Sequence, residues 1–331
     1  MTRGPCSDVS PKEPTGFLGG DVRALVTGVG GFVGKHLVSR LIAGRATVFG
    51  LDKDAPTRAE LQARFTVDLG SPGDVERALR QAQPTHVFHL AGVLGSAEAS
   101  PAALYQANVL GTATLFEAVG NAELDPSILV TGSSAVYGAC SRLPIHENEP
   151  FTPLTHYGTS KAAQEILCVQ YHLSRGLRVV RARTFNLVGP GLNRSLVLSG
   201  LCYQCAMVEA GEATAVHVGD VTPRRDFVDV RDAVRAYVLL AETGTSGEVY
   251  NVCGGRSYSV QECLDIVRHL AKVPLQVVSD PTRFRRAEIA EQVGRRDRLE
   301  KLGWRPEIPM EQSLADLLDD WRTRIREMRG S

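Results

Sequence analysis

The sequence lacks several features that would point to particular classes of protein. Its 37 Lys and Arg residues balance 37 Asp and Glu residues, so no net charge attracts nucleic acid or a membrane surface. No apolar run approaches the roughly 18 residues needed to span a bilayer, and residues 1–20 lack the apolar core of a signal peptide. We therefore expect a cytoplasmic protein with no nucleic-acid or membrane partner, and a flexible tail over residues 1–20.

Cysteine is also sparse. Seven cysteines are scattered over 331 residues, and an odd, scattered set in a chain of this length indicates reduced thiols. Cys202 and Cys205 form a lone C-x-x-C pair, with no second pair to complete a zinc site. Because the pair lies in an expected helix, we favour packing over metal or redox work and predict no metal.

Glycine, in contrast, is placed where a dinucleotide site needs it. A short apolar strand runs into Gly28, Gly31 and Gly34, which are spaced G-x-x-G-x-x-G at the start of an expected helix. The first permits a sharp turn, the second the approach of a pyrophosphate, and the third close packing of helix on strand. The helix N-terminus offers free N–H groups to phosphates. This turn, with Phe32 and Val33, predicts a cofactor site.

The strand that follows the first helix ends at Asp52. In a dinucleotide fold, an acidic residue at this position accepts hydrogen bonds from the adenosine ribose hydroxyls. The same carboxylate repels a ribose 2′-phosphate, so Asp52 favours NAD over NADP. Lys53 and Arg58 lie near enough in sequence to weaken this preference, and a surface turn residue is the alternative interpretation of Asp52.

Strands and helices alternate through the first half of the chain, including a third strand over 65–69 whose Asp68 could face adenine, and helices over 102–119 and 157–174. This alternation predicts an α/β, Rossmann-type, doubly wound parallel sheet covered on both faces. We assign residues 21–185 to that domain and 186–331 to a smaller α/β substrate-binding part. Residues of about 227–252 are expected to return to the first domain.

Three residues suggest the chemistry. Tyr157 and Lys161 are four apart and share one helix face, so the ammonium is expected to lower the pKa of the tyrosine for acid–base work. Ser133 ends the preceding strand, at the sheet edge where ligands bind. His86 and His89 are acid–base candidates by type alone, and a packing role is favoured for both.

At this point the sequence resembles the extended short-chain dehydrogenase/reductases, which include nucleotide-sugar epimerases, dehydratases and reductases. The matching pieces cover roughly residues 22–300: the glycine turn, Asp52, Asp68-Leu69, His89-Leu90-Ala91, Asn108-Val109-x-Gly111-Thr112, Ser133-Ser134-x-Val136-Tyr137-Gly138, Tyr157-Gly158-x-Ser160-Lys161, Arg183-x-Phe185-Asn186 and Arg225-Asp226-Phe227-Val228. The resemblance implies a catalytic trio of Ser133, Tyr157 and Lys161. It also implies that Lys161 holds the nicotinamide ribose.

The same resemblance extends the two binding sites. It implies that Asp68, Leu69, Leu90 and Ala91 join the glycine turn and Asp52 in binding the cofactor.

The C-terminal part is most similar to the branch acting on GDP-mannose-derived sugars, on the pieces Tyr250-Asn251-Val252-Cys253, Arg285-Arg286-Ala287-Glu288 and Leu302-Gly303-Trp304-Arg305-Pro306. The resemblance implies that Asn186, Arg225 and Arg286 grip the substrate diphosphate, with Ser133 and Ser134 near the sugar. Arginine forks match phosphate oxygens. A solvated basic face is the alternative for the arginine-rich loop over 283–296.

Two positions depart from the family pattern. The 4,6-dehydratases carry acidic residues directly after the position of Ser133, where this chain has Ser134 and Ala135. Neither can serve as a carboxylate acid or base, so dehydration is disfavoured. His156 stands where the family often has proline. We expect a loop residue there, and the alternative is that it assists proton transfer or contacts the sugar.

These features predict an NAD-dependent enzyme that modifies a nucleotide-diphosphate sugar, weakly favouring a GDP-sugar, by hydride transfer at C4. Our first hypothesis is a 4-epimerase with resident NAD, and the alternative is an NAD(P)H-dependent 4-keto-6-deoxy-sugar reductase. A catalytically silent nucleotide-binding protein is a third, weaker possibility. The resemblance also implies a homodimer that pairs the helices over 102–119 and 157–174.

The role of the tyrosine gives a first test. Tyr157→Phe removes the phenolic proton while keeping the ring, so we expect turnover to be abolished while cofactor binding persists. Steady-state kinetics and a fluorescence titration of the cofactor measure the two effects. Full activity in the variant would end the proposed mechanism.

Overall fold

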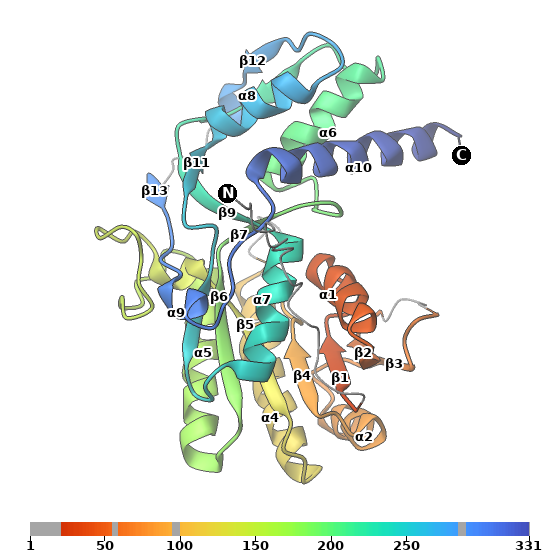
Figure 1. The fold of residues 1–331 in the computed structure, drawn as a ribbon, viewed down its shortest axis with the longest axis vertical. Helices are drawn as coiled ribbons and strands as arrows, with labels where there is room; N and C mark the ends of the chain where they lie inside the picture. Colours follow the sequence, from red (N-terminus) through yellow and green to blue (C-terminus); the bar gives the residue numbers. More distant parts are fainter. Residues whose placement is uncertain (1–20, 55–58, 95–99, 284–288, 331) are drawn as a thin grey trace, which may run out of the picture.

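The computed structural model describes residues 21–54, 59–94, 100–283 and 289–330 (Figure 1). The tail predicted for residues 1–20 lies outside this range. A seven-stranded parallel sheet has the order β10-β6-β5-β4-β1-β2-β3, which confirms the Rossmann-type α/β class. Its strands in chain order are β1 (Arg23–Thr27), β2 (Thr47–Asp52), β3 (Ala63–Thr66), β4 (His86–His89), β5 (Ser127–Ser133), β6 (Val179–Thr184) and β10 (Val249–Val252).

Both faces of this sheet are covered by helices. Successive side chains of each strand point to opposite sides, so they are buried in two separate core clusters. In β1, Ala24 and Val26 join one core cluster while Leu25 joins the other. Helices α1 (Phe32–Ala43) and α7 (Val230–Thr243) pack on the first face, and α2 (Pro72–Ala82), α4 (Gly111–Asn121) and α5 (His156–Arg175) on the second (Figure 1). Because both faces are covered, a ligand has room only at the ends of the strands.

The third strand is shorter and earlier than predicted. β3 pairs with β2 from Phe49↔Ala63 to Asp52↔Thr66, and β2 ends there. The chain then continues with Val67 donating its N–H to the Asp52 carbonyl at 2.9 Å. Asp68 and Leu69 therefore follow the strand instead of belonging to it.

The helix predicted over 102–119 is three segments in one path: α3 (Pro101–Tyr105), a π-helical turn η1 (Gln106–Leu110) and α4. The π-turn was not predicted, because nothing in its local sequence demands it. Within it Asn108 is fully buried, and its amide accepts from Val93 N–H at 2.9 Å and donates to Ser160 Oγ at 3.0 Å. Such turns occur frequently at functional sites.

The rest of the chain builds a second layer of structure above the carboxyl ends of the strands (Figure 1). Strand β9 pairs with β7, β11 and β13, and β8 pairs with β12. Helix α10 buries a stripe of apolar side chains, Leu314, Leu317, Leu318, Trp321 and Ile325. The elements of this layer are β7 (Asn186–Val188), α6 (Val197–Glu209), β8 (Val216–Val218), β9 (Arg224–Asp229), β11 (Ser257–Ser259), α8 (Val260–Leu270), β12 (Val277–Ser279), η3 (Pro281–Arg283), β13 (Glu291–Gln292) and α10 (Met310–Gly330). The short helix η2 (Ser134–Tyr137) follows β5, and α9 (Asp297–Glu300) packs Leu299 into the core on the first face of the large sheet.

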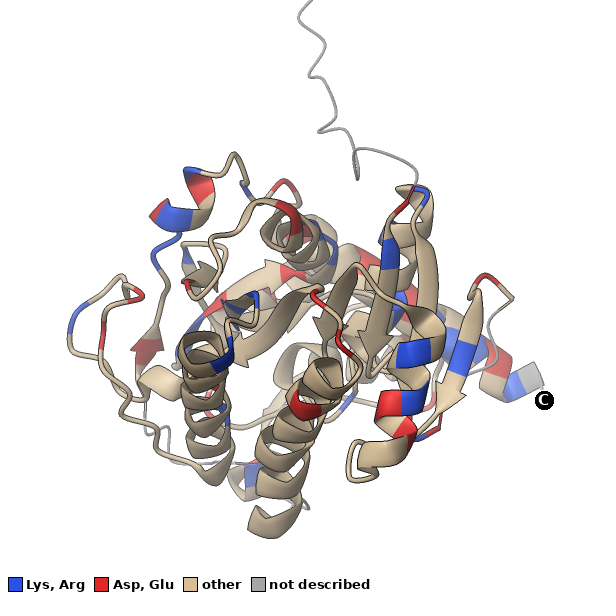
Figure 2. Ribbon diagram, turned by 90° about the horizontal axis from the view of Figure 1, so that it is seen from below, with Lys and Arg blue, Asp and Glu red and all other residues tan. Residues whose placement is uncertain are grey.

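Charge is spread without a dominant sign. Figure 2 shows acidic and basic residues interspersed over the face in view. In the described part of the chain, no helix combines the length and apolar character required to cross a membrane.

One buried carboxylate ties the second layer together. Asp226 in β9 accepts backbone N–H groups from Gly254 at 2.7 Å, Gly255 at 2.9 Å and Gly294 at 3.0 Å. The first two lie in the turn between β10 and β11, and the third follows β13. A buried N–H without a partner is costly, so this one side chain holds three segments in register.

Replacing this carboxylate should therefore destabilise the fold. Asp226→Ala removes the acceptor of three N–H groups, of which the hydrogen bond from Gly294 is buried and the other two are partly buried, and we expect the free energy of unfolding to fall by roughly 3 kcal/mol. Denaturant unfolding followed by circular dichroism measures it. Asp125→Ala is the matched control, because Asp125 makes an exposed ion pair with Arg178 whose loss is expected to cost less than about 1 kcal/mol. Equal effects of the two substitutions would contradict this role.

Candidate active site

A cavity of about 450 Å³ opens at the carboxyl ends of the parallel strands. It is lined by the glycine turn and by Ser133, Tyr157 and Lys161, the predicted trio. The predicted site residues that line it are Gly28, Gly31, Phe32, Val33, Gly34, Leu90, Ser133, Ser134, Tyr157, Lys161 and Asn186. Sequence positions more than 150 residues apart are thus brought together, as open parallel sheets require of their ligand sites.

The glycine turn has the shape that its sequence predicted. Gly28 has a φ of +71°, and a Cβ there would lie 2.8 Å from the Ala91 nitrogen. A Cβ at Gly34 would lie 2.5 Å from the Gly28 carbonyl oxygen, so neither position admits a side chain. Helix α1 begins directly after Gly31, with no side-chain cap and no acidic residue in its first turn. Its N–H groups and dipole therefore fit a diphosphate.

Asp52 lies beside this turn, where its Oδ2 accepts the Gly30 N–H at 2.9 Å. Asp68 is engaged elsewhere: it pairs with Lys53 at 2.9 Å and accepts the Gly70 N–H at 2.8 Å. The Gly70 N–H and the Lys53 ammonium hold the pKa of Asp68 below its usual range. Lys53 is therefore directed toward Asp68, and Asp52 lies beside the glycine turn at Gly30.

Two other predicted cofactor contacts have structural tasks. Leu69 is buried in the core cluster of the second sheet face, where it packs against Gly111. Ala91 donates its N–H to Thr27 Oγ1 at 3.1 Å, at the base of the glycine turn. Neither residue lines the cavity as the structure describes it.

The tyrosine and the serine of the trio meet through their side chains. Thr155 Oγ1 accepts the Gly158 N–H at 3.1 Å and so starts α5 at residue 156, which places Tyr157 in the first turn beside the end of β5. Burial raises the pKa of Tyr157, and the hydrogen bond with Ser133 opposes that rise. The prediction that the pKa of Tyr157 is lowered was wrong. Loss of hydration raises this pKa by more than the hydrogen bond lowers it, and the hydrogen bond comes from Ser133 and not from Lys161.

Lys161 is buried, with its ammonium held by two acceptors. Its Nζ donates to the Thr131 carbonyl at 2.9 Å and to Gln164 Oε1 at 3.0 Å. Burial lowers the pKa of Lys161 to about 8, although Cys168 and Glu165 favour its charged form.

The two strand histidines are not acid–base groups of the cavity. His89 is fully buried between Thr27 and Thr112, with its two ring nitrogens 2.8 Å and 2.9 Å from their hydroxyls. Burial, helped by the Lys161 charge, lowers the pKa of His89 to about 3, so the ring is neutral. His86 stands at the amino end of β4, away from the carboxyl edge.

The predicted substrate contacts divide into three groups. Asn186 lines the cavity and donates to the Asp226 carbonyl at 3.0 Å. Ser134 donates to Gln292 Oε1 at 3.1 Å, so its hydroxyl is already engaged. Arg225 donates to the Arg224 carbonyl at 2.8 Å and does not line the described cavity. Arg286 lies outside the described residues.

His156 is not a loop residue. It is the first residue of α5, because the Thr155 cap begins the helix one position earlier than predicted. Its Nδ1 lies 3.2 Å from the hydroxyl of Tyr105 at the end of α3. The two residues join α5 to α3 next to the catalytic tyrosine.

Two side chains at the site were missed from the sequence. Gln164 follows Lys161 by three residues, so helical spacing could have placed it on the same face. Gln292 bonds both Ser134 Oγ and the Ser134 carbonyl, and a separation of 158 residues left no local signal.

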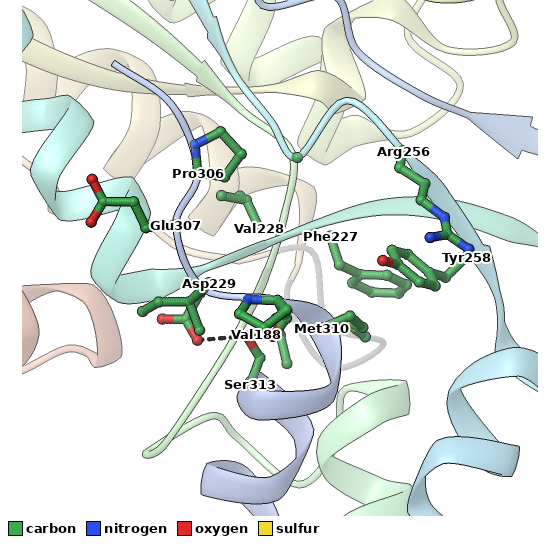
Figure 3. Close-up of a pocket in the computed structure, with 13 residues that line it drawn as sticks. Val188, Phe227, Val228, Asp229, Arg256, Tyr258, Pro306, Glu307, Met310 and Ser313 are labelled. Atoms are coloured by element: carbon green, nitrogen blue, oxygen red, sulfur yellow. Dashed lines mark hydrogen bonds between the residues drawn. The ribbon is translucent and has the colours of Figure 1, made fainter. Parts of the chain in front are cut away.

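A second hollow, of about 320 Å³, lies between β9, β11 and the start of α10 (Figure 3). Its floor is apolar, and Arg256 lies over the Tyr258 ring. Asp229 is already satisfied by Arg231 at 2.8 Å and Ser313 at 2.7 Å. No residue of the trio reaches it, so the first cavity is the candidate active site.

The cysteines that the structure describes are free thiols. Cys202 and Cys205 lie buried in α6, and burial raises the pKa of both. Among the described residues, no cluster of three or more His, Cys, Asp or Glu side chains could hold a metal ion.

A Rossmann-type sheet, a glycine turn and a Ser–Tyr–Lys trio on one cavity define a short-chain dehydrogenase/reductase. A family model described as GDP-mannose 4,6 dehydratase matches residues 25–317. The chain belongs to this family, an extended branch of nucleotide-sugar enzymes.

Individual relatives cover nearly the whole chain. The GDP-6-deoxy-D-mannose reductase of Pseudomonas aeruginosa is 40% identical over 92% of this chain and 99% of its own. The structure of RMD from Pseudomonas aeruginosa with NADPH has a TM-score of 0.82 and 37% identity, over 92% of this chain and 100% of that one. Thermus thermophilus UDP-glucose 4-epimerase with NAD has a TM-score of 0.81 and 29% identity, over 91% and 99%. The family therefore spans more than one reaction on this scaffold.

The contact between Ser133 and Tyr157 makes a pH prediction. Ser133→Ala removes the hydrogen bond that opposes the raised pKa of Tyr157, so that pKa should rise further and kcat should fall roughly 10- to 100-fold. The pH dependence of kcat measures both effects, with the tyrosine limb moving to higher pH. Ser133→Thr keeps the hydroxyl and is the matched control, and an unmoved limb in the alanine variant would contradict this role.

Proposed function

We propose that this protein reduces the 4-keto group of a GDP-linked 6-deoxy sugar with a nicotinamide cofactor. The observation that carries this choice is the 40% identity, over 92% of the chain, to a GDP-6-deoxy-D-mannose reductase. The sequence alone placed a 4-epimerase first, and this similarity reverses the order.

The lining of the cavity supports hydride transfer over dehydration. The titratable side chains that line its described part are Tyr157, Lys161 and Tyr237. Tyr237 shares a hydrogen bond of 2.7 Å with Thr184 Oγ1, and burial raises its pKa. Removal of water across C5 and C6 needs a further acid or base, and Ser134 and Ala135 supply none.

The residues of the cavity would bind the cofactor, orient the sugar and supply the proton. The N–H groups at the start of α1 would hold the cofactor diphosphate, and Lys161 would hold the nicotinamide ribose. The chemistry contributed by a bound reduced nicotinamide is a hydride for C4. Ser133 orients the C4 oxygen, and Tyr157 donates its phenolic proton to that oxygen as the carbonyl becomes an alcohol. The hydrogen bond with Ser133 stabilises the phenolate left behind until solvent reprotonates it.

The cofactor preference follows from Asp52. Its carboxylate lies beside the glycine turn at Gly30, which favours a ribose with free hydroxyls over one with a 2′-phosphate. Lys53, which could have softened this preference, pairs with Asp68. We therefore favour NADH, although the similar RMD was solved with NADPH.

A 4-epimerase with resident NAD is the second candidate. Its support is the position of Asp52 and the likeness to the Thermus thermophilus epimerase solved with NAD. The same trio would first remove the hydroxyl proton at C4 and then return it after the ketone turned over in the cavity.

A homodimer, expected from the family resemblance, has its support in exposed apolar side chains. Ile166 and Leu173 are 59% and 77% exposed on α5, and Leu110 is 53% exposed at the end of η1. Ile166 and Leu173 are two turns apart and so share one helix face. We propose that these helices pair across the dimer.

The assay that separates the candidates mixes purified protein with GDP-4-keto-6-deoxymannose and either NADH or NADPH. We expect one equivalent of NADH to be oxidised per sugar reduced, measured by absorbance at the nicotinamide band and by mass spectrometry of the sugar. Tyr157→Phe is the inactive control. Interconversion of a nucleotide-sugar pair without added cofactor, and no reduction, would make the epimerase the correct function.

A further inference from the structure

A continuous line of buried polar side chains runs beneath the cavity, from the catalytic lysine to the base of the glycine turn. Lys161, Gln164, Thr112, His89 and Thr27 come from α5, α4, β4 and β1, and each is buried. Buried polar groups are retained only when their hydrogen bonds are satisfied. The partners of each atom can therefore be worked out in turn.

The first link fixes the amide of Gln164. An ammonium only donates hydrogen bonds, so the group 3.0 Å from Lys161 Nζ must be the amide oxygen. The amide nitrogen then faces Thr112 and donates to its Oγ1 at 2.8 Å. Gln164 has no exposed surface, so it spans the gap between α5 and α4 without contact with solvent.

The second link fixes the tautomer of His89. Thr112 donates its single hydroxyl proton to the Asn108 carbonyl at 2.8 Å, so it accepts from His89 Nε2. Nδ1 is then unprotonated and accepts the hydroxyl proton of Thr27, whose oxygen accepts the Ala91 N–H. With the proton on Nε2, both ring nitrogens of His89 and the hydroxyls of Thr112 and Thr27 each have a partner of the right kind.

Lys161 depends on this line for its position. Of its three N–H donors, one is used by the Thr131 carbonyl and one by Gln164. The third is left for the cavity, which Lys161 lines. The four-carbon stem of a lysine is flexible, so the two acceptors determine where the ammonium and its third proton point.

We propose that Gln164 is a positioning residue for Lys161: it holds the ammonium against the cavity and is itself held by Thr112. The role of Gln164 in catalysis rests on the proposed function, whereas the titration described below tests its effect on Lys161 without any substrate. Reduction and epimerisation both need Lys161 in this place.

The charged and titratable groups around Lys161 set the expected direction. On α5 these are Tyr157, Glu165 and Cys168, and from β4 the neutral His89. The Glu165 carboxylate is taken up by Arg183, with contacts of 2.9 and 3.0 Å. Loss of the Gln164 oxygen removes an acceptor from the ammonium and should lower the pKa of Lys161 from about 8. A carboxylate at position 164 should raise it.

The test is an NMR titration of the whole protein labelled with ¹³C at lysine Cε. The chain has six lysines, and the spectrum of Lys161→Arg identifies the signal of interest. We expect the Lys161 midpoint to fall by about one pH unit in Gln164→Met and to rise by about one unit or more in Gln164→Glu. Thr112→Val, which frees the far end of Gln164, should lower it less.

Gln170→Met is the matched control, because Gln170 lies on α5 and makes an exposed hydrogen bond with Ser174. It should leave the Lys161 midpoint unchanged. The proposal is overturned if the midpoint is the same in the wild type, Gln164→Met and Gln164→Glu, or if the control moves as far. If Gln164→Met does not fold, Gln164→Glu decides alone, since it keeps the shape of the side chain and an unmoved midpoint rejects the role.

The pH dependence of kcat gives the second readout. The limb that reports Lys161 should move to lower pH in Gln164→Met and return toward or beyond the wild-type position in Gln164→Glu. A purely structural role would lower the melting temperature without moving either the NMR midpoint or this limb. If the wild type reduces no sugar, the proposed function fails, while the NMR titration still tests Gln164.

Discussion

The burial of one ammonium group is the constraint on which the site depends. A charge taken out of water must be given hydrogen-bond partners, and Lys161 receives two, from the end of β5 and from its own helix. Meeting that demand places α5 across the carboxyl end of β5, which in turn sets Tyr157 beside Ser133. The catalytic geometry follows from satisfying a buried charge.

The other end of the cavity obeys a steric constraint. Strand β1 and the chain after β4 approach so closely that no Cβ fits at Gly28. The same approach brings the Ala91 N–H to Thr27 and leaves the N–H groups of α1 facing the cavity. A close backbone contact and a buried ammonium thus stand at opposite ends of one site, joined underneath by His89, Thr112 and Gln164. Both constraints suit reduction and epimerisation alike, because each reaction moves a hydride at C4 and a proton at the C4 oxygen, once in a reduction and out and back in an epimerisation.

Features of the fold that depend only on residues close in sequence could be predicted from the sequence. The turn at Gly28 and the apolar strand that leads into it depend on neighbours in the chain, and both were predicted. Other features depend on residues far away in the sequence. The end of β3 is set by the length of its partner β2, and the π-turn is held by hydrogen bonds of Asn108 to Val93 and Ser160. Position 156 was assigned to a loop because the Thr155 cap was overlooked, although a threonine three residues before a helical N–H is a recognisable signal.

The sequence by itself determined the fold class, through the alternation of strands and helices, and the glycine turn, through spacing within one strand–helix unit. It singled out Ser133, Tyr157 and Lys161 by their place at a strand end, by helical spacing and by the family resemblance. Only the tertiary structure decided what those groups experience. Burial raises the pKa of Tyr157 and lowers that of Lys161, and hydration is a property of the packed molecule. Likewise, Ser134 is engaged by Gln292 and Lys53 by Asp68, contacts between segments that no pattern within either one could reveal.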